Sequence, residues 1–156
     1  MRLIHLSILL LGAGCSHAAA RHQGDLCRSD GNERSEVFGQ VENGSEKDLQ
    51  RTLHSLRCLD GGDLEDAHVA IGVALFRDQE HVEPQLDSSG LSNDDVQSIA
   101  SMLPSNFVDE PCAAASELSR RKKLALGSRQ LGVMKQPILK SIEEALSREE
   151  KYCRAR

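Results

Sequence analysis

Aromatic side chains are nearly missing from this chain of 156 residues, which has no tryptophan, one tyrosine and three phenylalanines. Sites that bind sugars or peptidoglycan usually stack an aromatic ring on the ligand, and hot spots of protein interfaces are rich in Trp and Tyr. The scarcity therefore disfavours a carbohydrate-binding protein. A surface that binds a protein partner must depend on Arg, Leu and Met instead.

A surplus of positive charge is missing as well, since 19 Lys and Arg residues stand against 24 Asp and Glu residues. Proteins that bind nucleic acid need cationic contacts to the phosphates, so this balance argues against a nucleic-acid partner. The chain has one basic cluster, Arg120-Arg121-Lys122-Lys123. We expect it to be the solvated end of a helix, where positive charge complements the helix dipole, rather than a phosphate site.

Motifs for catalysis and metal binding are also missing. The chain has neither a G-x-S-x-G nucleophile motif nor a C-x-x-C pair, and His54 with Cys58 lacks the second pair of ligands that a zinc site requires. The acidic stretch 60–66 does not have the spacing of an EF-hand loop. It fits better as a Gly stop followed by the acidic first turn of a new helix. We therefore predict no metal, no cofactor and no catalytic residue.

The longest apolar run near the N-terminus, Leu3 to Leu11, is too short to cross a bilayer about 30 Å thick and has the length of a signal-peptide core. We predict that residues 1–20 are a signal peptide. Ala18-Ala19-Ala20 is a small-x-small site, so one possible cut lies after Ala20 and would release a secreted chain. A second possible cut lies before Cys15.

That second cut rests on a resemblance. The segment Leu11-Gly12-Ala13-Gly14-Cys15 resembles the lipobox of bacterial lipoproteins, in which apolar and small residues precede an obligatory cysteine. The resemblance covers only this segment and implies that the sulfur of Cys15 carries a diacylglyceryl group. It also implies that the lipid anchors the protein to a membrane of the cell envelope, facing the periplasm. Two or three acyl chains hold a protein firmly where one holds it marginally.

Either cut removes Cys15 from disulfide pairing and leaves an even number of cysteines, which in an exported chain indicates two disulfides. Three connectivities are possible among Cys27, Cys58, Cys112 and Cys153. We favour Cys27–Cys58 and Cys112–Cys153, because each bridge closes a local segment and the second can join two helices.

The patterning predicts an all-α protein. Residues 21–44 have few apolar side chains and are expected to form a flexible N-terminal arm. Residues 45–156 are expected to form a single helical domain of about five helices, packed as a small antiparallel bundle or a short helical stack. The expected helices run from Ser45 to Asp60, from Asp63 through the apolar run 69–76, from Ser92 to Pro104, over 110–125, and onward from Pro137, with a turn at 81–90.

Two functions follow from these features. The first is a non-catalytic binding, inhibitory or scaffolding module of the cell envelope, held by a lipid anchor and acting on a protein partner. The second is a small secreted enzyme or ligand carrier, with a pocket near His68 and the 60–66 acidic stretch. The lack of motifs favours the first.

Overall fold

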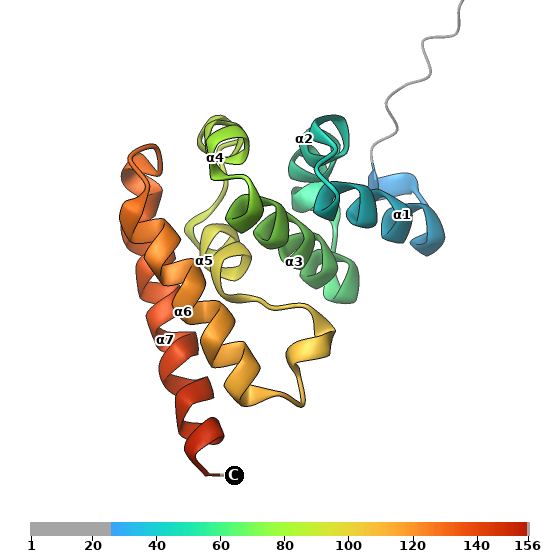
Figure 1. Cartoon of the computed structure of the whole chain (residues 1–156). Coiled ribbons are helices and arrows are strands. Elements are labelled where there is room, and N and C mark those ends of the chain that lie inside the picture. The colour runs from blue at the N-terminus through green and yellow to red at the C-terminus, as the bar shows by residue number, and fades with distance from the viewer. Residues whose placement is uncertain (1–25, 156) are drawn as a thin grey trace, which may run out of the picture.

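The computed structural model describes residues 26–155, and this part of the chain is all-helical, without a strand (Figure 1). It contains seven α-helices where the sequence predicts about five. The signal segment and Cys15 lie outside the described residues. The helices are α1 (Gly31–Glu42), α2 (Glu46–Ser55), α3 (Gly61–Arg77), α4 (Gln79–Ser88), α5 (Asn93–Ser101), α6 (Pro111–Gly127) and α7 (Lys135–Arg154).

The expectation of a flexible arm over residues 21–44 is wrong for residues 31–42, which form α1. The Asp30 side chain caps this helix by accepting a hydrogen bond from the backbone N–H of Glu33 at 2.9 Å. Three apolar residues at helical spacing, Val37, Phe38 and Val41, are buried. Three apolar residues suffice to hold α1 to the protein because they all lie on the one helix face that the rest of the protein covers.

The expected turn at 81–90 is also wrong, because α4 runs through it. Pro84 lies inside this helix on the exposed side, where its missing N–H removes one hydrogen bond of the helix. Val82 and Leu86, four residues apart, are both buried and hold the helix to the core. Tertiary packing therefore overrides the local cost of the proline.

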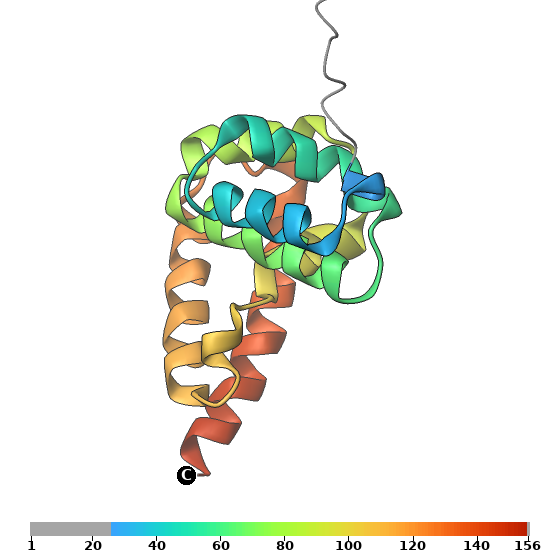
Figure 2. The same ribbon diagram turned by 90° about the vertical axis from the view of Figure 1, so that its right-hand side faces the viewer.

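Helix α3 lies at the centre of the arrangement, as the apolar run 69–76 predicts. It packs against α1 and α4, and its contact with α5 joins the N-terminal helices to the C-terminal ones. Helices α6 and α7 form a long antiparallel pair that extends past the other helices (Figure 2). Each of the two ends of the fold closes with a disulfide: Cys27–Cys58 links the start of the described chain to the end of α2, and Cys112–Cys153 links α6 to α7. The favoured connectivity is confirmed.

The contact between α3 and α5 requires a glycine. A Cβ at Gly72 would overlap the backbone carbonyl oxygen of Ile99 and lie 3.3 Å from Nη1 of Arg121. The backbones of the two helices can approach this closely only because residue 72 has no side chain. The helix-propensity cost of Gly72 is thus offset by packing at the centre of the fold.

Arg121 lies in this central region, which contradicts the expectation that the basic cluster 120–123 is solvated. Its side chain is 1% exposed. Its Nη1 donates hydrogen bonds to the carbonyl oxygens of Ala100 at 3.2 Å and Met102 at 2.9 Å, at the end of α5. Its guanidinium carbon lies 5.0 Å from the centre of the Phe76 ring. The cluster is not terminal, because α6 continues to Gly127.

Glu117 balances the charge of Arg121 one turn earlier in α6. Its Oε1 accepts a hydrogen bond from Arg121 Nε at 3.1 Å, and Arg120 donates to the same carboxylate. Burial raises the pKa of Glu117, but the hydrogen bonds from the two arginines outweigh this and lower the pKa overall. Burial lowers the pKa of the Arg121 guanidinium, which nevertheless remains charged at neutral pH.

We predict that Arg121→Met lowers the free energy of unfolding by about 2–4 kcal/mol, because it leaves two carbonyl oxygens at the end of α5 without their donor. Lys123→Met is the control from the same basic cluster. The Lys123 side chain is exposed, so the loss should be about 1 kcal/mol or less. Urea unfolding followed by far-UV circular dichroism measures both. Equal losses for the two variants would contradict the central role of Arg121.

Candidate functional site

Two hollows lie beside the segment that connects α5 to α6. We call residues 102–110 the connecting strap. One hollow, of about 600 Å³, lies between the strap and helices α1 and α3, and a second, of about 450 Å³, lies between the strap and helices α6 and α7. The two hollows share four residues of the strap: Met102, Leu103, Pro104 and Val108. The strap thus has an accessible surface on both sides.

We call the larger hollow the acidic groove. Its wall from α1 is formed by one helix face, with Phe38 and Glu42 four residues apart, and its wall from α3 by Glu65, Asp66 and Val69. The remaining lining residues are Ser35, Gly39, Met102, Leu103, Pro104, Ser105 and Val108. The groove therefore combines an apolar surface with three carboxylates.

No cationic side chain lines the acidic groove. In the part of the chain that the structure describes, none of Glu42, Glu65 and Asp66 belongs to an ion pair. The neighbouring Asp63, by contrast, pairs with Arg34 and joins α1 to α3 just before the groove begins. The groove consequently carries uncompensated negative charge.

The structure separates His68 from the acidic stretch with which the sequence grouped it. Glu65 and Asp66 line the groove, but His68 is 4% exposed, and its Nε2 lies 3.0 Å from Oδ1 of Asp95 in the first turn of α5. Asp66 and His68 point to nearly opposite sides of α3 because successive helical residues are about 100° apart. His68 therefore does not line the hollow that Glu65 and Asp66 line.

The other sequence candidates have structural roles. His54 is exposed, and its Nε2 lies 3.1 Å from the Arg57 guanidinium, while Cys58 is in a disulfide. Between residues 26 and 155, no group of three or more His, Cys, Asp or Glu side chains is placed to hold a metal ion. None of the helices described there is long and apolar enough to cross a membrane.

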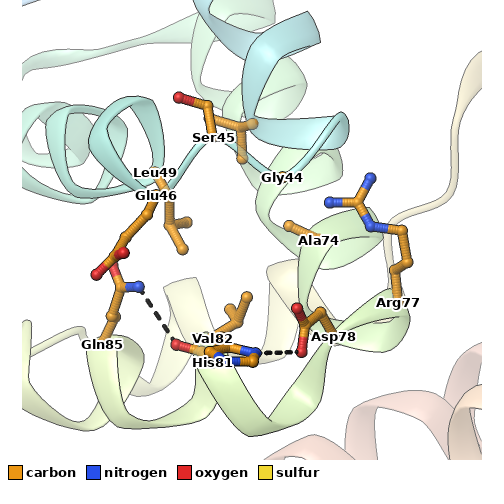
Figure 3. Close-up of a pocket in the computed structure, with 11 residues that line it drawn as sticks. Gly44, Ser45, Glu46, Leu49, Ala74, Arg77, Asp78, His81, Val82 and Gln85 are labelled. Atoms are coloured by element: carbon orange, nitrogen blue, oxygen red, sulfur yellow. Dashed lines mark hydrogen bonds and ion pairs between the residues drawn. The ribbon is translucent and has the colours of Figure 1, made fainter.

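A third hollow, of about 240 Å³, lies among α2, α3 and α4 and contains a histidine that sequence reasoning overlooked (Figure 3). His81 Nδ1 lies 2.8 Å from Oδ1 of Asp78. The hydrogen bond to the Asp78 carboxylate raises the pKa of His81, and the same bond lowers the pKa of Asp78. The D-x-x-H spacing could have indicated this pair, but only if α4 had been recognised as a helix.

The pair does not extend into a catalytic triad. Ser45, the hydroxyl in the same hollow, caps α2: its Oγ donates to Asp48 Oδ2 at 2.6 Å and accepts from the Asp48 N–H at 3.3 Å. Figure 3 shows its hydroxyl pointing away from His81. A serine nucleophile has to donate its proton to the histidine, so this arrangement lacks the bond that activates it.

No known protein family, curated protein or solved structure matches this chain. The site must therefore be interpreted from its own geometry and charge.

We predict that the His81 imidazole titrates at a pH above the ordinary value of 6.5, and that Asp78→Asn lowers this midpoint. Glu46→Gln should lower it much less, because Glu46 acts on His81 only through a weaker electrostatic interaction. Histidine side-chain NMR measures the three midpoints. An unchanged midpoint in the Asp78→Asn protein would contradict the pair.

The pair of His81 and Asp78 also determines in which direction the stability of the fold changes with pH. His81 has a raised pKa, so its contribution is fully present below pH 6.5 and is lost as the pH rises through its folded pKa. Asp78 has a lowered pKa, so it remains ionised over that range and its contribution is lost only as the pH falls through its own folded pKa.

Proposed function

We propose that this protein is a small exported, lipid-anchored protein of the bacterial cell envelope that binds a protein partner without catalysis. The observation that carries the binding role is the pair of hollows flanking the connecting strap. Val108 lies at the boundary of both with its side chain 78% exposed, and Leu103 and Pro104 beside it are only half-buried. Accessible apolar side chains around hollows of this size are typical of protein-binding surfaces.

Export is supported by the cysteines. The two disulfides are consistent with an exported protein, since such bridges persist in oxidising compartments. They use four of the five cysteines and leave Cys15, the cysteine of the lipobox-like segment, outside the bridges. Ten residues separate Cys15 from Leu26, so a lipid on Cys15 would keep the described fold within about 40 Å of the membrane surface.

A binding role fits the geometry better than the alternative of a secreted enzyme or ligand carrier with a pocket near His68 and the 60–66 stretch, because the buried His68 does not line the hollow that Glu65 and Asp66 line. The histidine that does line a hollow, His81, is no better placed for such a role. The hollow that contains His81 measures about 240 Å³, below the roughly 300–1,000 Å³ that small-molecule pockets occupy. Its histidine side chain is 76% exposed, so water would compete for every polar contact to a ligand. The hollows beside the strap are larger and more open to solvent, and they suit an extended partner surface.

The first test concerns the anchor. Produced in a bacterial host that processes lipoproteins, the wild-type chain should partition into the detergent phase and have a mature mass that begins at Cys15 with added lipid. Cys15→Ser should remain in the aqueous phase, because the sulfur that receives the lipid is gone. A wild-type mass that begins at Arg21 without lipid would exclude the anchor but leave the binding role standing.

The second test concerns the binding surface. A photo-crosslinking amino acid in place of Val108 should give a defined adduct with an envelope protein in the native host. The same amino acid in place of Val133, whose side chain is 86% exposed but which does not line the hollows beside the strap, is the matched control. Mass spectrometry identifies the adducts. Equal adduct patterns at both positions would mean that the strap is not a specific binding surface.

A further inference from the structure

We propose that the acidic groove binds a cationic amphipathic peptide segment, in which Lys or Arg residues are interspersed with aliphatic ones at helical spacing. This inference rests on the proposed binding function and assigns its partner chemistry. The groove offers two complementary features to such a segment: apolar lining residues and three carboxylates without an ion-pair partner.

The negative charge of the groove determines the sign of the charge that its partner must carry. Glu42 ends one wall, Glu65 and Asp66 lie on the other, and no Lys, Arg or His lines the space between them. Three like charges around one hollow reinforce each other's potential, which attracts a cationic segment and repels an anionic one. For the same reason an anionic lipid headgroup does not suit this groove.

The apolar lining of the acidic groove is the reason that the partner must also carry aliphatic side chains. Phe38 lies at the wall of the groove with its side chain buried, while Val69 and Leu103 are half-buried and accessible from the groove. A purely cationic segment would leave Val69 and Leu103 facing water. An aliphatic side chain between two basic ones would cover them, as amphipathic peptides do in other grooves.

Only one of the two hollows beside the strap has the charge that favours a cationic segment. The hollow on the α6–α7 side also has an apolar lining, but its charged residues are Arg148 and Glu149, which form an ion pair with each other at 3.4 Å. That side therefore has no net charge to complement. The preference for a cationic segment is local to the groove between the strap and helices α1 and α3.

The test uses the full chain with Cys15→Ser, produced with both disulfides, and three synthetic peptides of about 14 residues. The first places Lys and Leu at amphipathic helical spacing, the second replaces every Lys by Glu, and the third replaces every Leu by Ser. Fluorescence anisotropy measures the dissociation constants. We expect the Lys-Leu peptide to bind at least tenfold more tightly than either of the others, with an affinity that falls as salt is added.

Variants locate the site. Combining Glu42→Gln, Glu65→Gln and Asp66→Asn should weaken binding of the Lys-Leu peptide about tenfold or more. The control combines Glu80→Gln, Asp87→Asn and Asp94→Asn, which changes the net charge equally at exposed positions outside the groove. It should weaken binding less than threefold. Val108→Ser should weaken binding several-fold, and Val133→Ser should leave it unchanged.

Either of two results would overturn the inference: equal binding of the Lys and Glu peptides, or equal weakening by the groove variant and its control. If either result is found while Val108 still gives a specific crosslink in the host, the binding function stands and only the partner chemistry is wrong. If the peptides bind as expected but no crosslink forms at Val108, the groove has the proposed chemistry and the proposed native protein partner is the part that fails.

Discussion

The shape of this protein depends on a charged side chain placed where apolar ones would be expected. Arg121 lies at the junction of α3, α5 and α6 and donates to the two carbonyl oxygens at which α5 ends. The last carbonyls of a helix have no partner within the helix, so a buried helix end needs an external donor. Burying a guanidinium is costly, and Glu117, the two carbonyls and the Phe76 ring together offset that cost.

That interaction also determines where the connecting strap begins. Met102 is both the C-cap of α5 and the first strap residue, and its carbonyl oxygen is held by Arg121. The strap therefore leaves α5 in a fixed direction, and the Cys112–Cys153 disulfide anchors the start of α6 shortly beyond the strap's other end. Arg121 thus fixes the start of the strap, and the disulfide fixes the helix that follows it. Neither Arg121 nor the disulfide lines the acidic groove.

Local signals in the sequence predicted much of the fold. The helix starts expected at Ser45 and Ser92, where the two serines cap α2 and α5, and the apolar run 69–76 each correctly indicate a helix, and the favoured pairing of the cysteines gives the connectivity. The two missed helices are those whose local signal is weak: α1 has three buried apolar residues, and α4 contains Pro84. Their stability comes from contacts with α3, which no short window of sequence contains.

The candidate site was harder to predict for a related reason. Glu65 and Asp66 are conspicuous in the sequence as part of the 60–66 acidic stretch, but Glu42 belongs to the segment expected to be flexible. The groove exists only because α1 forms and packs beside α3, and because Arg121 directs the strap toward both. The groove is lined by three segments that are distant in the sequence, so it depends on the tertiary contacts between them. Two of its three carboxylates lie together in the sequence, whereas the contribution of Glu42 and the shape of the groove required the fold.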